Sequence, residues 1–497
     1  MDINDLAFNQ DFSYILVSSA SGHKIFNCEP FGEFYSLSAN KSVAQPTAIL
    51  RMLFSTSLTI IVPKGPSGTR ILHVYNLKQN TKICELTFPL DIVDLMLNRK
   101  RLVVFLEVGQ IYIYDLSSIR VVKILDVNSL LTSDGKKLPV LAALSANDNS
   151  LLVLPILLIN TQTDLFNSVP STGGSNSHPN TPVLRPTDSS VLQTLGQFVE
   201  FTQKNSDTNL LKADVVTLED IQSDSPGWVL VYDTINLKPR LVYKAHDAAI
   251  AKIAISHDGN YIATASQKGT IVRVCHVSQD PVSESSKLII SLITNLRRGH
   301  NHTTINALLF NLDLTLLGCS SDSNTIHLFT VKERATGAEN ADAADDNEYS
   351  SEEDSQGGKS SSEDLNENLA NLLLLKQPES TSKGKENKST YFSALKSSKK
   401  LLNNLYTKSL MKKLPYRNYL DSLIWEKPRR SFAYVKLPEY IPNSKHHKNV
   451  EIGFTSSGLL MLASYNTGIL YQYRLPRGAG DEREECGLMS LNSLVDV

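Results

Sequence analysis

The chain has 497 residues and a nearly balanced charge, with 49 Lys and Arg residues against 51 Asp and Glu residues. This length allows one large domain or two medium domains with a sizeable core. The charge balance argues against a general nucleic-acid binder, which is usually strongly basic. The five cysteines are scattered without metal-ligand spacing, so we expect a reduced compartment and no metal site.

No segment of the sequence predicts entry into or passage through a membrane. The first residues are acidic and lack the apolar stretch of a secretory signal. The longest apolar run, residues 151–159, is interrupted by Pro155 and falls short of the roughly 20 residues that span a bilayer. We therefore expect a cytoplasmic protein whose contact with membranes is peripheral.

Short apolar runs recur about every ten residues, separated by Gly, Asn, Asp or Ser, and group into units of about forty residues. Aromatic-polar pairs such as Tyr114-Asp115 and Tyr232-Asp233 stand where a standard repeat has Trp-Asp. The sequence therefore predicts an all-β, seven-bladed β-propeller with degenerate WD40-like repeats, closed by pairing of an N-terminal strand with the last blade. The seven units cover residues 6–37, 49–89, 92–127, 138–243, 249–293, 305–329 with 431–437, and 450–475.

Two long segments break this rhythm and predict disordered insertions, because they are polar and lack periodicity. The first is rich in Ser, Thr, Asn and Pro, and the second changes from acidic to basic along its length. The predicted organisation is propeller in residues 1–159, insertion in blade four at 160–225, propeller at 226–331, insertion in blade six at 332–430, propeller at 431–475 and a C-terminal tail at 476–497.

The basic half of the second insertion carries apolar residues at spacings near three and four, interleaved with lysines. This pattern is typical of a basic amphipathic helix, and its apolar face includes Phe392, Leu395, Leu402 and Leu405. Three interpretations stay open: a helix at a membrane interface, a helix packed on the propeller or a partner, and a disordered basic stretch. The acidic, serine-rich half is a plausible target of phosphorylation.

Two consecutive arginines, Arg297 and Arg298, stand where the fifth unit leads into the sixth. On an extended backbone their side chains point to opposite faces, so one pair can serve two pockets. The planar guanidinium donates to phosphate oxygens in a fork and stays charged at physiological pH. The alternative is a solvated pair in salt bridges with nearby carboxylates.

Short hydroxyl donors and histidines flank the arginine pair in both neighbouring repeats, as a phosphorylated sugar headgroup requires. These residues have a structural alternative, since Ser and Thr commonly cap turns and a His before a blade often bonds within the sheet. The candidates are His246, Ser266, Thr270 and Arg273 upstream, and Thr303, Ser321, Thr325 and His327 downstream.

With these neighbours, the stretch Leu296-Arg297-Arg298-Gly299 resembles the PROPPIN family, β-propellers that bind polyphosphoinositides and share a Phe/Leu-Arg-Arg-Gly motif. Leu296 stands where most members carry Phe. Segments 52–58, 84–89, 98–102 and 110–115 also resemble fungal members, and similarity covers roughly residues 1–160, 226–330 and 431–475.

The resemblance implies two headgroup sites at the rim of blades five and six, for phosphatidylinositol 3-phosphate and phosphatidylinositol 3,5-bisphosphate. In the family the loop between the last two strands of blade six inserts into the membrane, which here implies insertion of Phe392, Leu395, Leu402 and Leu405. Carried over by position, the first site takes His246, Ser266, Thr270, Arg273 and Arg297, and the second takes Arg298, Thr303, Ser321, Thr325 and His327.

Fungal members act in autophagosome formation and the cytoplasm-to-vacuole pathway. The resemblance thus implies a peripheral phosphoinositide effector on preautophagosomal, endosomal and vacuolar membranes, with a further role in vacuole morphology. One subgroup delivers a lipid-transfer partner and another recruits the machinery that lipidates a ubiquitin-like protein, and the sequence does not separate them. The rival class is a soluble scaffold without a lipid role. No catalytic motif is present, so we expect neither an enzyme nor a cofactor nor a nucleic-acid partner.

Overall fold

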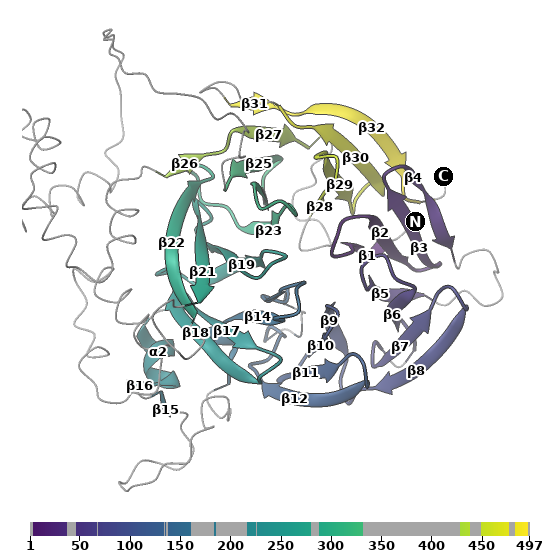
Figure 1. Cartoon of the computed structure of the whole chain (residues 1–497), viewed down its shortest axis with the longest axis horizontal. Helices are drawn as coiled ribbons and strands as arrows, with labels where there is room; N and C mark the ends of the chain where they lie inside the picture. The colour runs from purple at the N-terminus through teal and green to yellow at the C-terminus, as the bar shows by residue number, and fades with distance from the viewer. Residues whose placement is uncertain are drawn as a thin grey trace, which may run out of the picture. The chain divides into compact units, whose positions relative to one another are not determined.

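The computed structural model describes residues 3–36, 46–66, 68–133, 135, 138–160, 183–184, 216–224, 226–279, 288–331, 428–437, 449–476 and 483–495. All of these belong to one compact unit formed by Met1–Arg334 and Asn418–Val497. Its strands form seven sheets of four or five strands, which follow one another around a ring (Figure 1). The predicted seven-bladed β-propeller is confirmed.

The first four blades take their strands in chain order. Blade one contains β1 (Ile3–Phe8), β2 (Tyr14–Ser19), β3 (Gly22–Cys28) and β4 (Phe31–Ser36). Blade two contains β5 (Thr47–Met52), β6 (Leu58–Pro63), β7 (Ile71–Asn76) and β8 (Thr81–Thr87). Blade three contains β9 (Ile92–Leu97), β10 (Arg101–Leu106), β11 (Gln110–Asp115) and β12 (Arg120–Asp126). Blade four contains β13 (Ala143–Leu144), β14 (Leu151–Pro155), β17 (Trp228–Asp233) and β18 (Lys238–Lys244), with the short helix η1 (Ile156–Leu158) after β14.

The last three blades include strands from distant parts of the chain. Blade five contains β19 (Ile250–Ile255), β20 (Tyr261–Ser266), β21 (Ile271–Gln279) and β22 (Leu288–Arg297), and β26 (Arg429–Arg430) adds in parallel. Blade six contains β23 (Ile305–Phe310), β24 (Leu316–Ser321), β25 (Thr325–Thr330) and β27 (Ala433–Lys436), and β31 (Glu484–Glu485) adds in parallel. Blade seven contains β28 (Val450–Phe454), β29 (Leu460–Ser464), β30 (Ile469–Arg474) and β32 (Gly487–Ser493). The delayed last strand of blade six, predicted at 431–437, is confirmed by β27.

Burial along the strands follows their place in the blade. Middle strands such as β10 and β14 are buried at every position, because neighbouring blades cover both faces of each sheet. Outer strands such as β8 and β32 expose most of their residues. The β-branched and aliphatic residues that fill the middle strands therefore form the cores between blades.

The ring closes differently from the prediction. An N-terminal strand does not complete the last blade: β1 pairs with β2, and β32 pairs with β30 as the outer strand of blade seven. Residues that the sequence analysis placed in a C-terminal tail thus belong to the propeller. Blades one and seven meet through side chains, where the Tyr465 hydroxyl donates to the carbonyl oxygen of Leu6 at 3.0 Å.

Part of the first insertion is ordered. Residues of β16 (Val216–Thr217) pair with β15 (Val183–Leu184), and α2 (Leu218–Asp224) follows. The spacing of Leu218 and Ile221 puts both on one face of this helix, and both are fully buried in the core shared by blades three and four. The rest of that insertion, residues 332–427 and the side chains Phe392, Leu395, Leu402 and Leu405 lie outside the described residues.

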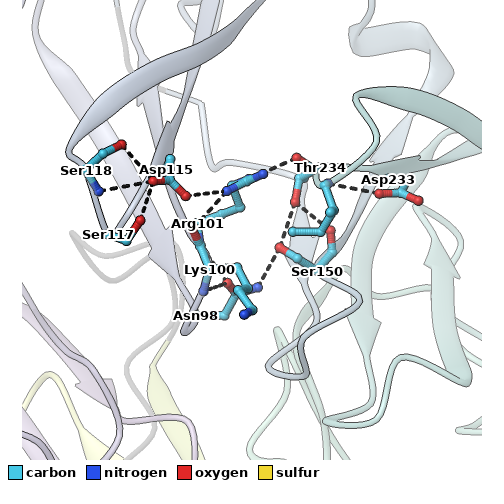
Figure 2. A network of polar contacts seen from close by, with 10 residues as sticks. Asn98, Lys100, Arg101, Asp115, Ser117, Ser118, Ser150, Asp233 and Thr234 are labelled. Carbon is cyan, nitrogen blue, oxygen red and sulfur yellow. Dashed lines mark hydrogen bonds and ion pairs between the residues drawn. The ribbon is translucent and has the colours of Figure 1, made fainter.

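A buried polar network joins blades three and four (Figure 2). Arg101 reaches across the junction, donating from Nε to the carbonyl oxygen of Thr234 at 2.9 Å and from Nη1 to Oδ1 of Asp115 at 2.8 Å. Asn98 donates to the hydroxyl of Ser150 at 2.8 Å. The charge of this arginine is therefore neutralised inside the fold.

A second arginine, Arg51 on β5, connects three blades. It forms ion pairs with Asp5 on β1 and, at 2.9 Å, with Asp94 on β9. All three side chains line a cavity of about 530 Å³ among the inner strands. In the described part of the chain, no helix has the length and apolar character needed to cross a membrane.

Candidate functional site

The arginine pair lies at the end of the outer strand of blade five. β22 runs through Arg297, which confirms the extended backbone expected there, and the N–H of Arg298 donates to the carbonyl oxygen of Thr270 at 2.9 Å. Leu296 is fully buried in the core shared with blade six. Burial of the Leu296 side chain therefore fixes the backbone position of Arg297 and Arg298.

The two arginines have different neighbours. Arg297 lies 3.0 Å from Nδ1 of His300 through its Nη2 atom. Arg298 donates from Nε to the carbonyl oxygen of Gly269 at 2.7 Å and from Nη2 to that of Asn301. Within the described ranges neither arginine forms an ion pair with a carboxylate, so the alternative of a salt-bridged pair finds no support in them.

The strand register of blade five shows that Arg297 and Arg298 lie toward different neighbouring blades. Thr264, Arg273 and Asn295 are directly paired across β20, β21 and β22, so they share one face, and Ser266 and Arg297 lie two residues further along on that face. This face packs against blade four, whereas Leu296 faces blade six. Arg298 continues toward blade six, beside His327.

The first cluster lies between blades four and five. His246 is buried, with Nε2 3.1 Å from the Thr264 hydroxyl, and Arg273 donates from Nη1 to the carbonyl oxygen of Ala245 at 2.6 Å. The Nε atom of Arg273 is buried and has no hydrogen-bond partner among the described residues. Ser266 is buried, whereas Thr270 is half-buried at the turn before β21. Arg297 shares the face but contacts neither His246 nor Arg273 directly.

The second cluster lies between blades five and six. His327 on β25 is buried and pairs with Cys319, while Ser321 and Thr325 occupy the same face two residues away. The Ser321 hydroxyl lies 3.0 Å from that of Ser323, and the Thr325 hydroxyl donates to Oδ1 of Asn324 at 3.2 Å.

A close backbone approach holds the two repeats together at this point. Gly269 has φ +61°, and a Cβ there would lie 1.7 Å from the carbonyl oxygen of Thr303. Only glycine fits such a position. Thr303, half-buried, is thereby placed against the turn that accepts Arg298, while Gly299 has open space around it.

The charge at both clusters comes from arginine. Burial and the charge of Arg273 lower the pKa of His246 to about 3. Burial and the charges of Arg483 and Arg298 lower the pKa of His327 to about 3. Burial also lowers the pKa of Arg298. Neutral imidazoles and cations without carboxylates make both clusters complementary to an anion.

Sequence reasoning missed several residues around this edge. β26 aligns Arg429 with Leu296 and Arg430 with Arg297, and Ser431 lies 3.4 Å from Nδ1 of His327. Arg483 contacts the same nitrogen. The tandem Arg429-Arg430 was a visible signal, but nothing in the sequence linked it or Arg483 to the motif. No group of metal-ligating side chains gathers in the described segments.

The family model described as PROPPIN matches residues 3–171 and 216–350, more than half of the chain and the whole of both clusters. The chain belongs to the PROPPIN family. This PROPPIN is 48% identical to autophagy-related protein 21 of Debaryomyces hansenii and 47% identical to that of Candida albicans, each with 99% of both chains covered. Autophagy-related protein 18 of Saccharomyces cerevisiae is 33% identical over 66% of this chain and 62% of its own length.

Solved structures share the fold of this PROPPIN. The complex of KlAtg21 with the coiled-coil of AgAtg16 superposes with a TM-score of 0.54 at 23% identity, covering 100% of both chains. Kluyveromyces lactis Hsv2 superposes with a TM-score of 0.54 at 16% identity, covering 99% of each chain. At these identities the likeness concerns the fold alone.

Proposed function

We propose that this PROPPIN is a peripheral membrane effector that binds phosphatidylinositol 3-phosphate and phosphatidylinositol 3,5-bisphosphate through the two clusters. The observation that carries the proposal is Arg298, which is only 9% exposed yet has no carboxylate partner in the described structure. A desolvated cation without a counter-charge is costly, and a bound phosphate removes that cost. The unpartnered Nε of Arg273 supports the same role for the first cluster.

The neutral groups fit the rest of such a ligand. Ser266, Thr270, Thr303, Ser321 and Thr325 present short hydroxyls near the arginines, and inositol hydroxyls both donate and accept hydrogen bonds. A histidine that stays neutral can donate one ring N–H to a phosphate oxygen without adding charge. The ligand therefore combines phosphate with a polyhydroxylated ring.

The cellular role follows from the family. Relatives over the full length carry the name autophagy-related protein 21, which supports a place in autophagosome and cytoplasm-to-vacuole vesicle formation. On this proposal the propeller sits on preautophagosomal, endosomal and vacuolar membranes and recruits a lipid-transfer partner or the ubiquitin-like conjugation machinery. The neighbour bound to the AgAtg16 coiled-coil is consistent with a protein partner. A soluble scaffold without a lipid role is the alternative.

The deciding experiment is liposome flotation of the full chain with Arg297 and Arg298 both changed to Thr. Binding to vesicles with either phosphoinositide should be lost while the melting transition stays in place, because removing a buried cation that has no counter-charge relieves a desolvation cost. Each single change should weaken binding less, since two sites on one rigid body act through effective concentration. The matched control removes the same charge from blade three by changing Arg120 and Lys123 to Thr. A folded double variant that floats like the parent would contradict the proposal.

We also propose that Phe392, Leu395, Leu402 and Leu405 enter the membrane interface beside the headgroup sites. In the sequence that insertion lies between β25 and β27, which pair with each other in blade six, and this supports the proposal. Each buried side chain can contribute on the order of 1–2 kcal/mol. Changing all four to Asp should leave binding of soluble headgroups intact and strongly reduce vesicle retention. Equal retention of this variant and the parent would favour a protein-docking role.

A further inference from the structure

A third arginine, Arg483, reaches the second cluster from near the C-terminus. It precedes β31, which pairs in parallel with β27 of blade six. Its Nη2 atom donates to Nδ1 of His327 at 2.5 Å, and its guanidinium carbon lies 5.0 Å from the ring centroid of Tyr434. A residue 156 positions away in sequence thereby contacts the imidazole whose pKa Arg298 also lowers.

The charges that act on this imidazole come from arginines. Arg483 and Arg298 both act on His327, and Arg430 in turn acts on Arg483. In the described segments no carboxylate forms an ion pair with Arg298 or Arg483. Two guanidinium groups that act on one imidazole, with a third cation acting on Arg483, suit a ligand that carries more than one negative group.

The contact also fixes the state of His327. Because Arg483 can only donate, Nδ1 must accept, and the proton of the neutral ring is then on Nε2. The Ser431 hydroxyl, 3.4 Å away, lies at the same Nδ1 atom. The Nε2–H group is left to donate, and no described residue accepts from it.

We propose that Arg483 is an additional anion ligand and positioning residue of the second site, which holds His327 as its Nε2–H tautomer and favours a bisphosphorylated over a monophosphorylated inositol headgroup. This inference rests on the proposed function and names the ligand preference of the second site. The Arg483 guanidinium at His327 gives the second phosphate its own forked donor.

The competing explanation is structural, with Arg483 only fastening β31 by stacking on Tyr434. The test measures each site alone, using the full chain and soluble dibutanoyl forms of the two phosphoinositides in titration calorimetry. In the R297T background, where the second site remains, R483Q should weaken binding of the bisphosphate about tenfold and of the monophosphate by less. In the R298T background, where the first site remains, R483Q should change nothing.

Two further measurements separate ligand contact from structure. R483K keeps the charge without the fork and should restore part of the affinity for the bisphosphate. The ring ¹⁵N resonances of His327 should move from a pure Nε2–H pattern toward a mixture in R483Q, whereas the melting temperature should change little. R474Q, which removes an exposed arginine at the end of β30, is the matched control and should bind like its parent.

The outcomes distinguish the two proposals. If R483Q binds the bisphosphate like its parent in the R297T background, or loses the same affinity in both backgrounds, the inference is overturned while the proposed function stands. If the variant with both Arg297 and Arg298 changed to Thr still binds, the proposed function fails.

Discussion

Arg101 and Arg298 are buried to the same extent, with 9% of each residue exposed, but their surroundings differ in charge. At the junction of blades three and four, Arg101 meets the carboxylate of Asp115 as well as backbone oxygens. At the edge between blades five and six, Arg298 donates to the backbone oxygens of Gly269 and Asn301, and no carboxylate among the described residues pairs with it. The fold neutralises the charge of the first arginine, whereas we propose that a bound anion neutralises the charge of the second.

Burial alone therefore does not separate a structural arginine from the arginine that we propose binds an anion. What separates them is whether the chain supplies the counter-charge. Breaking an internally neutralised pair leaves an uncompensated carboxylate, whereas removing an arginine that has no counter-charge relieves a desolvation cost. Replacing the arginine with a neutral residue should therefore destabilise the protein at Arg101 but not at Arg298.

The largest effect on stability is expected for Arg101→Gln. It removes the ion pair with Asp115 and the bond to Thr234, and should lower the free energy of unfolding by about 2 kcal/mol without changing phosphoinositide binding. Arg298→Gln should change stability by less than about 1 kcal/mol and abolish binding at the second site. Urea denaturation measures the stability of both variants, and titration calorimetry measures their phosphoinositide binding. A loss of stability for Arg298→Gln as large as for Arg101→Gln would contradict the distinction between the two arginines.

A smaller effect on stability is expected from pH. It reports whether His246 stays neutral, so that arginine alone carries the charge of the first cluster. The pKa of His246 is about 3 in the folded protein and about 6.5 in an unfolded chain, so between these values the unfolded state binds more protons. Stability should fall as pH drops through 6, by about 1 kcal/mol per pH unit for this residue.

His246→Asn tests that dependence, because it removes one titrating group without adding charge. Between pH 6.5 and 5 its unfolding free energy should fall less steeply than that of the parent. If both proteins lose stability in parallel, His246 does not stay neutral in the folded state.

The smallest effect is expected for deletion of residues 340–420 with a short Gly-Ser linker. β25, β26 and β27 stay in the chain, and a shorter surface connection changes closure entropy little, so the melting temperature should move by less than about 2 °C. Binding of soluble headgroups should persist, since both clusters lie on blades four to six. Failure of this variant to fold would mean that folding of the propeller depends on the deleted segment.

The sequence predicted most of the ring because the period of the apolar runs is set by strands packed on both faces. It also placed β27 across a gap of about a hundred residues, and it predicted the extended backbone at Arg297. β32 escaped notice because an outer strand exposes Leu488 and Leu491 and so lacks a buried face to impose alternation. α2 was missed because one buried turn is too short for helical periodicity to stand out.

The sequence predicted only those candidate site residues that lie close together along the chain. The motif and its flanking hydroxyls lie within one stretch of two repeats, so their spacing carried the signal. Arg430 and Arg483 join the edge through parallel pairing of two-residue strands, and such short pairings leave no pattern in the sequence.

The position of Arg51 has a consequence for how the propeller opens. Its guanidinium on β5 is held by carboxylates of β1 and β9, so separating any one of these three inner strands exposes an unpaired buried charge. In native-state hydrogen exchange, the amides of β1, β5 and β9 should therefore share one opening free energy and exchange as a single cooperative unit. Blades one to three would then behave as one foldon, separate from the edge between blades five and six.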